Sequence, residues 1–418
     1  MRTVIALGAL NVALAGAREG FGPFLGVYLQ QQGFDPAATG LAMGLAGAAG
    51  LLATTPIGAL IDRTAGKRAA LALAVAAIAL GALALVATRS LWVIGAAQLV
   101  IGVADTSIAP LVAALTLGMV GKEAYGAQVS RNEALNHAGN AANAALSGVL
   151  GYTLGLGTVS IAIVVMAVAS CVVLLGVDRG SIDHAAARGG EADERSTLRV
   201  LVDSRPLMVL AATVFAYQTA NGAMLSFLAQ ARTAAGADPS ITTGVMSVVA
   251  QATMVGAALL AARIAGGGGQ GAGSGRGRGA GPGSGRGRGH AGVLSLALGL
   301  VVVRGVLAAF ATSWWIVIPV QVLEGLAMGL GGVAIPALVA EIMDDTGHAT
   351  AGLGSVMTAF GAGAAVSPLL AGLVAQYLGF SAAFLALAVV AGIGLALWIV
   401  GRRLPGGAVR GGAVETPA

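Results

Sequence analysis

Two long apolar segments are joined by the stretch Gly58-Ala-Leu-Ile-Asp62-Arg63-Thr-Ala-Gly66-Lys67-Arg68-Ala-Ala-Leu71, which holds four charged side chains. One apolar helix must end here and another must begin, so the sequence predicts a tight loop at a membrane surface. The loop has a net positive charge. It is therefore expected in the cytoplasm, because short loops rich in lysine and arginine stay on that side.

The whole chain has the composition of a membrane protein. Its 418 residues are 57% hydrophobic and only 10% charged, with a mean hydropathy of +0.87, whereas soluble domains carry about 25% charged residues. The formal charge of +5 does not indicate a nucleic-acid partner, because the basic residues fall between apolar runs and mark the topology. The single cysteine, Cys171, allows no internal disulfide, and we expect no metal and no cofactor.

Apolar runs of about 20 residues predict twelve transmembrane helices in a lipid bilayer. The expected spans are roughly 4–30, 37–60, 69–88, 91–117, 128–154, 157–177, 206–230, 240–262, 291–312, 314–340, 350–376 and 380–401. An even number of spans puts both termini on one side. With the termini in the cytoplasm, only Arg89 and Arg232 among the 23 lysines and arginines fall outside, so we expect a multi-pass protein of the inner (plasma) membrane with both termini cytoplasmic.

The spans divide into two sets of six. Residues 1–177 form the expected first bundle, 178–205 a charged cytoplasmic linker, 206–402 the second bundle, and 403–418 a cytoplasmic tail. Residues 266–289 are almost all glycine, serine and arginine, which predicts a disordered cytoplasmic loop. This loop has no aromatic side chain on which a base could stack, so a tether is favoured over RNA binding.

The two halves are weakly similar in sequence. Residues 20–30 can be aligned with 220–230, and the segment Gln98–Gly102 with Gln321–Gly325. Three glycines of the fifth span recur at a constant offset in the eleventh: Gly139 with Gly363, Gly148 with Gly372, and Gly155 with Gly379. Duplicated six-helix halves are typical of several transporter folds, which bind their substrate near the midplane between the halves.

The opening stretch resembles the loop signature of the major facilitator superfamily, G-x-L-x-D-R-x-x-G-[RK]-[RK]-x-x-L. The matching residues are Gly58, Leu60, Asp62, Arg63, Gly66, Lys67, Arg68 and Leu71. The resemblance extends to about residue 403 and implies an all-α membrane protein, with twelve transmembrane helices in two pseudo-symmetric six-helix bundles that alternately open a central cavity to either side. It also implies that Asp62 sits near the end of a helix of the other half, where a positive N-terminus favours a carboxylate, and that Arg63 completes a charge network.

The chain departs from the family pattern in three places. Ala262 stands in the second half where the signature has its aspartate, and Gln98 stands where proton-coupled members have an arginine in the fourth span. The segment Gly139-Asn-Ala-Ala-Asn143 lacks the proline of drug antiporters. The last two absences weaken the interpretation as a proton-antiport drug exporter.

Charged side chains in the middle of the first span are functional candidates. Each costs about 2.5–3.5 kcal/mol at the bilayer centre, so Arg18 and Glu19 need partners or water. One interpretation places the pair in the cavity. The other makes it a structural ion pair that holds the first span to the fifth.

A polar stripe runs along the fifth span, with side chains three and four residues apart on one helical face. It consists of Glu133, Asn136, His137, Asn140, Asn143 and Ser147. A lipid-facing stripe of this kind is untenable, which leaves cavity lining or hydrogen bonds between helices. His137 could relay protons with Glu133 or Asp105, or act only as a hydrogen-bond partner.

In the second half, Glu324 and Arg304 lie at similar expected depths. A buried arginine needs a partner, so the two are predicted to form a structural ion pair. The other candidates for the substrate or proton pathway are Gln98, Asp105, Gln218, Asn221 and Gln321.

These features predict a secondary transporter that is a monomer and not an enzyme. No nucleotide loop of the G-x-x-x-x-G-K-[ST] type occurs, so ATP-driven transport by this chain is not expected. The expected activity is proton-coupled efflux, by antiport, of a small drug or metabolite. The alternative is a proton-coupled importer, or symporter, of a polar or anionic solute. A transport-inactive receptor is disfavoured by the charges within the spans.

Overall fold

The computed structural model is helical throughout the residues it describes, which are 2–19, 21–64, 66–176, 204–266, 286–344 and 349–403; no strand occurs in these ranges. Almost all of the predicted linker 178–205 and of the tail 403–418 lies outside the described residues. The predicted Gly/Arg loop is also mostly outside them, but its last four residues, 286–289, are helical. The expectation of disorder is wrong for these four, because the helix that follows begins earlier than its apolar run.

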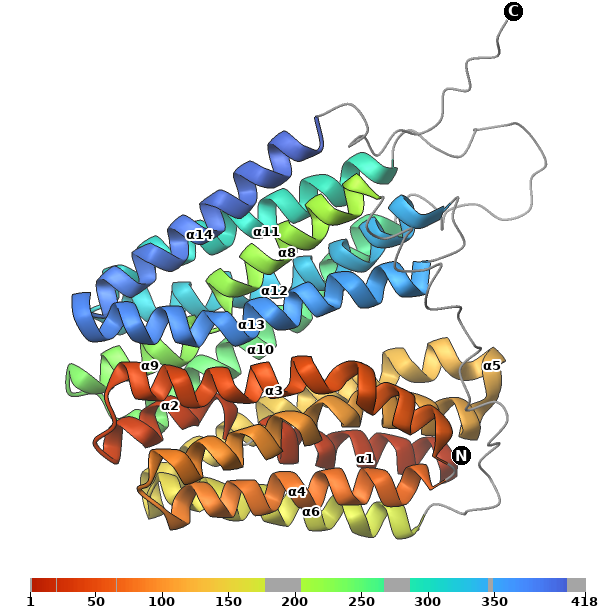
Figure 1. Ribbon diagram of the computed structural model, residues 1–418, viewed down its shortest axis with the longest axis horizontal. Coiled ribbons are helices and arrows are strands. Elements are labelled where there is room, and N and C mark those ends of the chain that lie inside the picture. The colour runs from red at the N-terminus through yellow and green to blue at the C-terminus, as the bar shows by residue number, and fades with distance from the viewer. Residues whose placement is uncertain are drawn as a thin grey trace, which may run out of the picture.

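The helices are labelled as in Figure 1. They are α1 (Arg2–Glu19), α2 (Gly22–Gln31), α3 (Pro36–Arg63), α4 (Lys67–Ala87), α5 (Leu91–Leu154), α6 (Val159–Leu175), α8 (Arg205–Asn221), α9 (Met224–Ala234), α10 (Pro239–Gly266), α11 (Arg286–Ala309), α12 (Trp314–Met343), α13 (Ala349–Leu378) and α14 (Phe380–Gly401), with a short 3-10 turn, η1 (Leu156–Thr158), before α6. Helix α5 turns sharply at Gly121, where φ is 73° and ψ is 172°. It therefore has a first arm, 91–120, and a second arm, 122–154.

Nine described segments are long and apolar enough to cross a membrane. The other three expected spans have a different character. The first is divided into α1 and α2, the seventh into α8 and α9, and the fifth is the polar second arm of α5. The all-helical membrane fold is confirmed, and the count of twelve crossings stays a prediction.

The helices form two bundles, α1 to α6 and α8 to α14, drawn red to yellow and green to blue in Figure 1. The bundles are built alike. The broken helices α1–α2 and α8–α9 occupy matching places, and residues 20–30 and 220–230 each contain the break. Two aligned residues even meet across the bundle boundary, where Gln30 Nε2 donates to the backbone oxygen of Gln230 at 3.2 Å.

The paired glycines have matching environments. A Cβ built on Gly139 would lie 2.8 Å from the Cβ of Ala15 in α1, and one built on Gly363 would lie 2.9 Å from the nitrogen of Thr219 in α8. Each glycine thus lets its helix approach the first helix of its own bundle. This agreement shows that the duplication inferred from sequence is present in the packing.

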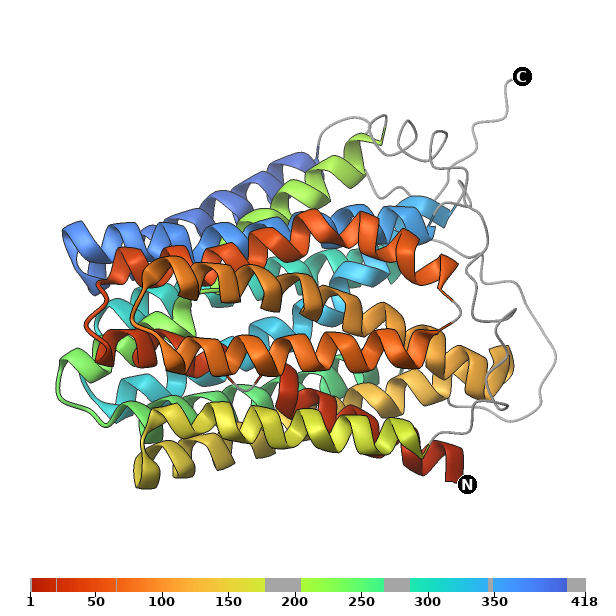
Figure 2. The same cartoon turned by 60° about the horizontal axis from the view of Figure 1, so that its bottom comes forward.

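The two bundles touch near one face of the molecule. There α5 meets α10 and α13 meets α3: a Cβ on Gly148 would lie 3.2 Å from the Cα of Gly244, and one on Gly372 would lie 3.0 Å from the Cα of Gly40. We call this the closed face. Figures 1 and 2 show that α1 begins at the other end of the molecule, the terminal face, and that α14 runs toward that end; Figure 1 shows the bundles splaying apart toward it.

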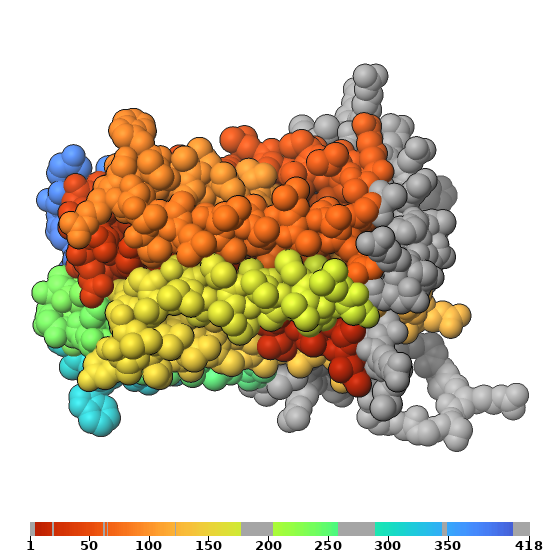
Figure 3. Space-filling model, turned by 90° about the horizontal axis from the view of Figure 1, so that it is seen from below, coloured from red at the N-terminus to blue at the C-terminus, as the bar shows by residue number. Residues whose placement is uncertain are grey.

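Side chains at the outside of the bundles are those expected against lipid. Figure 3 looks onto α4 and α6, which pack together on the surface of the first bundle. Leu73, Leu80 and Leu175 are exposed on these helices. Near the closed face, Trp92 and Trp315 occupy equivalent positions at the starts of α5 and α12, and 89% and 90% of their surfaces are exposed. Tryptophans in such places mark a membrane interface.

Candidate functional site

The loop between α3 and α4 makes its described contacts within its own bundle. Lys67 is buried, and its Nζ donates to the backbone oxygen of Ile61 at 2.9 Å and to that of Thr64 at 3.4 Å. Arg68 donates through Nη2 to the backbone oxygen of Leu174 at the end of α6. Arg63 is exposed. The cations of the signature therefore tie together three helix ends of the first bundle.

The two signature glycines are open, and the key acid lies outside the described side chains. A Cβ on Gly58 would meet nothing within 4 Å, and Gly66 is exposed at the start of α4. The backbone of Asp62 is helical, but its side chain is not described. Its predicted contact with the other bundle stays a prediction.

An ion pair joins α1 to the first arm of α5. Arg18 Nε lies 2.6 Å from Asp105 Oδ1, and Arg18 Nη2 lies 3.3 Å from Oδ2, so the carboxylate receives two parallel hydrogen bonds. The side chains are 28% and 41% exposed. This ion pair of Arg18 is with the fourth span, whereas the sequence suggested a pairing of the first span with the fifth, which stays a prediction. The side chain of Glu19 is outside the described set.

A polar pocket lies between α1 and both arms of α5, close to this ion pair. Its volume is about 90 Å³, which is room for several water molecules or one small functional group. The polar side chains that line it are Asn11, Arg18, Thr116, Tyr125, Asn132, Glu133 and Asn136. We call it the α1–α5 pocket.

The polar stripe on the second arm of α5 does not face a single environment. Glu133 and Asn136 line the α1–α5 pocket. His137 instead reaches α10, where its Nδ1 lies 3.4 Å from Gln251 Oε1. Asn140, Asn143 and Ser147 are buried in helix packing. A relay from His137 to Glu133 or Asp105 therefore has no support in the described contacts, and the hydrogen-bond interpretation of His137 fits them.

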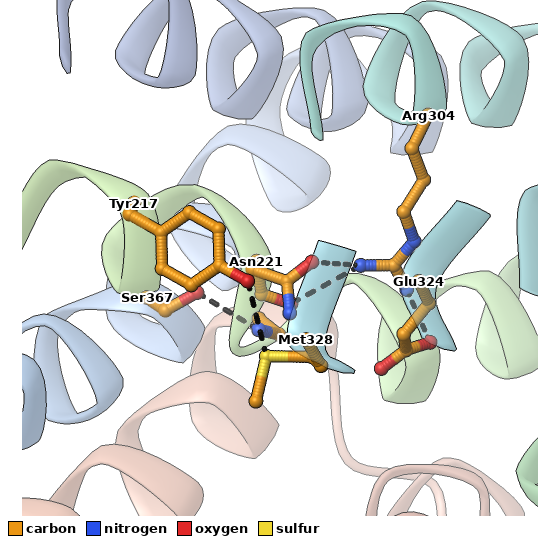
Figure 4. Close-up of polar contacts among 7 residues, drawn as sticks. Tyr217, Asn221, Arg304, Glu324, Met328 and Ser367 are labelled. Carbon is orange, nitrogen blue, oxygen red and sulfur yellow. Dashed lines mark hydrogen bonds and ion pairs between the residues drawn. The ribbon is translucent and has the colours of Figure 1, made fainter. Parts of the chain in front are cut away.

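The second bundle contains the predicted pair of Arg304 and Glu324 (Figure 4). Arg304 is completely buried, and its Nη2 donates to Glu324 Oε2 at 2.6 Å. Its Nη1 donates to Asn221 Oδ1 at 2.5 Å and to the Asn221 backbone oxygen at 3.5 Å. Since α8 ends at Asn221, the guanidinium also satisfies a carbonyl left open by the break.

The other side of the break is held by α13. Ser367 Oγ accepts a hydrogen bond of 2.8 Å from the backbone nitrogen of Ala223, just before α9 (Figure 4). Nearby, Tyr217 donates to the sulfur of Met328 at 3.5 Å. Sequence reasoning did not single out Ser367, Tyr217 or Gln251. The Asn221-Gly222 step was the one signal for this region, because it marks a break whose polar groups need partners.

The three predicted pathway glutamines, Gln98, Gln218 and Gln321, are all buried. Among the residues that the structure describes, neither polar side-chain atom of Gln321 has a hydrogen-bond partner, and Gln218 Oε1 has none. In this state the three glutamines are buried between packed helices. The described residues contain no cluster of three or more histidine, cysteine or acidic residues that could hold a metal ion.

Comparison with known proteins agrees with the fold. A sequence model of the Major Facilitator Superfamily matches residues 7–269 and 281–417. The uncharacterized MFS-type transporter Rv2456c of Mycobacterium tuberculosis (strain ATCC 25618 / H37Rv) is 34% identical over 410 residues, which cover 96% of this chain and 93% of that protein.

Solved structures of transporters are similar in fold at low identity. The nucleoside transporter NupG superposes with a TM-score of 0.73 at 12% identity, covering 97% of this chain and 99% of that one. The human organic anion transporter MFSD10 (TETRAN) gives 0.60 at 17% identity, with 95% and 99% covered. A bacterial homolog of the human lysosomal transporter Spinster, in an inward-facing and unoccupied conformation, gives 0.71 at 13% identity, with 95% and 96% covered. The chain belongs to the Major Facilitator Superfamily of membrane transporters, which are not enzymes.

Proposed function

We propose that this transporter moves a small organic solute by alternating access, driven by protons, as a monomer in the inner (plasma) membrane with its termini in the cytoplasm. The observation that carries the proposal is the ion pair between Arg18 and Asp105. Arg18 lies at the break between α1 and α2, and Asp105 lies midway along the first arm of α5; a partly exposed ion pair within a membrane bundle is expensive, and such groups mark substrate or proton pathways.

The described state fits one end of an alternating-access cycle. The bundles meet at the closed face through Gly148 with Gly244 and Gly372 with Gly40, whereas a Cβ at Gly58 or Gly354, near the terminal face, would meet nothing within 4 Å. With the termini in the cytoplasm, this state is open to the inside. The opposite state requires the glycine contacts to separate and the α3–α4 loop to approach α13.

Asp105 is the group we propose to carry the proton. A proton that binds a carboxylate oxygen of Asp105 makes the side chain neutral and removes its charge attraction to Arg18. Of the two hydrogen bonds that join α1 to the first arm of α5, at 2.6 and 3.3 Å, the one to the protonated oxygen is then lost and the other is no longer made to a charged acceptor. The first expected span is divided into α1 and α2, so α1 is a short separate helix. We propose that α1, with its ion pair to Asp105 weakened, is able to shift relative to α5.

Efflux of a drug or metabolite by proton antiport is the direction we propose. Symport of a polar or anionic solute is the second candidate, and it is favoured by the segment Gly139-Asn-Ala-Ala-Asn143, which lacks the proline of drug antiporters and places polar side chains on α5. The two candidates differ in one observable quantity: protons and solute move in opposite directions in antiport and in the same direction in symport.

The test uses proteoliposomes with a pH indicator inside. A solute is first chosen by its thermal stabilisation of the purified protein. Asp105→Asn should lower gradient-driven solute movement at least about fivefold, the lower end of usual coupling between two ligands, and should leave counterflow exchange intact. Glu123→Gln is the matched control, an exposed acid at the start of the second arm of α5. If Asp105→Asn drives solute against its gradient as well as the wild type does, Asp105 is not the coupling group.

A further inference from the structure

The α1–α5 pocket has an excess of negative charge. Arg18 and Glu133 both line it. The charge of Arg18 is balanced by Asp105. Glu133 has no ion-pair partner among the residues that the structure describes. The three charges together leave one net negative charge, carried by the carboxylate of Glu133.

The other charged or titratable residues close to Glu133 on its helix do not cancel this charge. Arg131 is exposed and precedes Glu133 by two residues, which places it about 200° away around the helix. His137 follows by four residues, on the same side, but its described contact is with Gln251 of α10. A negative charge in a polar cleft with helical walls attracts cations.

The hydrogen-bonding groups of the pocket also favour a positively charged ligand. Asn11 uses its Nδ2 on the backbone oxygen of Leu7, which leaves its Oδ1 as an acceptor. Both polar side-chain atoms of Asn132 have partners, because its Oδ1 accepts from Gln128 and its Nδ2 donates to Thr116. Tyr125 adds an aromatic ring, and ring faces attract ammonium groups. Arg18, the one cation among the described residues that line the pocket, is already held by a carboxylate.

We propose that the α1–α5 pocket recognises a positively charged ammonium group on the transported solute, with Glu133 as the recognising carboxylate. The role in transport rests on the proposed function. The volume of about 90 Å³ suits a head group and not a complete solute, so the rest of the molecule extends beyond the pocket. An anionic solute finds no uncompensated cation among the described side chains of this pocket, which argues against the anionic variant of the symport candidate.

The test uses three probes of the same shape and different charge: choline, its uncharged isostere 3,3-dimethyl-1-butanol, and 3,3-dimethylbutanoate. Each is titrated against the purified protein at fixed pH and ionic strength, without a gradient, and binding is measured by thermal stabilisation and calorimetry. We expect choline alone to bind, with an affinity that falls as salt is added. Glu133→Gln should weaken choline binding about fivefold or more.

Two further variants keep the test decisive. Glu123→Gln removes an exposed acid elsewhere on the same arm and should bind choline like the wild type. Ala113→Leu fills the pocket and should abolish choline binding even if Glu133→Gln does not fold. Equal binding of the uncharged or anionic probe, or wild-type choline binding by either Glu133→Gln or Ala113→Leu, would overturn the inference.

The binding test is independent of the coupling test. Loss of uphill transport in Asp105→Asn together with no choline binding leaves the proton-coupled function standing and rejects the ammonium site. Choline binding that depends on Glu133, together with normal uphill transport by Asp105→Asn, supports the ammonium site and rejects Asp105 as the coupling group.

Discussion

Two buried cations, Lys67 and Arg304, each end at the carboxyl end of a helix. Lys67 binds the last carbonyls of α3, and Arg304 binds the carbonyl of Asn221 at the end of α8. A helix end has carbonyls without intrahelical partners and a partial negative charge, so a cation there satisfies both. The cost of removing these charges from water is offset by such contacts and, for Arg304, by the carboxylate of Glu324.

Loss of one partner from the pair of Arg304 and Glu324 should cost more than loss of both. Arg304→Met leaves Glu324 as a buried charge without its partner, at an expected cost of about 3–5 kcal/mol in unfolding free energy. In the double variant Arg304→Met/Glu324→Gln this charge is absent, so the loss should be smaller than the sum of the single losses. Denaturant unfolding in detergent measures the cycle. Strictly additive losses would show that the two side chains do not interact energetically.

At the scale of helices, the closed face depends on glycines, which let the helix backbones approach closely. Helices α5 and α10 approach through Gly148 and Gly244, and α13 and α3 approach through Gly372 and Gly40. The four glycines form two equivalent contacts, because the bundles are duplicates. Each contact joins one helix of the first bundle to one of the second, so both must separate before the closed face can open.

Gly244→Ala should weaken the closed face. Its Cβ would lie 3.1 Å from the Cα of Gly148 in α5, which cannot move away as a flexible side chain could. Gly256→Ala on the same helix is the control, because its Cβ meets nothing within 4 Å. In a Cys171→Ala background, a cysteine at the buried Thr39 near the closed face should react faster with a water-soluble maleimide in Gly244→Ala. Equal rates in the two glycine variants would contradict a contact that holds this face closed.

At the scale of the whole molecule, the loop that identifies the family has described contacts only to its own bundle. Its cations bind α3 and α6 ends, and Gly58 is open. Gly58 therefore has no packing reason to be glycine in this state. We predict that the need for glycine arises in the proposed opposite state, in which the α3–α4 loop would lie against the second bundle.

Gly58→Leu should separate stability from transport. The described state has space for the side chain, so unfolding free energy should change by less than about 0.5 kcal/mol. In the opposite state the side chain would meet the second bundle, and a penalty of about 1.4 kcal/mol would reduce that state tenfold. Counterflow in proteoliposomes measures transport, and denaturant unfolding measures the free energy of unfolding. Normal transport with reduced stability would place the need for Gly58 in the described state.

The sequence predicted much of this architecture because hydropathy and sparse charges dominate a membrane chain. Apolar runs located most helices, and the depth of Arg304 and Glu324 was sufficient to pair them, since a buried arginine has few possible partners. The partner of Arg18 was not predictable from spacing, because it depends on how α1 rotates against α5. The division of the polar stripe has the same cause: the second arm of α5 lies between α1 and α10, so one helical face meets two environments.

The burial of Arg304 also has a consequence for biogenesis. Helix α11 is synthesised before α12, so an α11 that left the translocon alone would expose Arg304 to lipid before Glu324 could reach it. The segment Gly289–Ala309 of α11 has a mean hydropathy of 2.2 with Arg304 included. Its apolar side chains must offset a cost of about 2.5–3.5 kcal/mol for an arginine at a helix centre. Helices α11 and α12 are therefore expected to leave the translocon together as a hairpin. A nascent chain arrested before Glu324 should remain in contact with the insertion machinery.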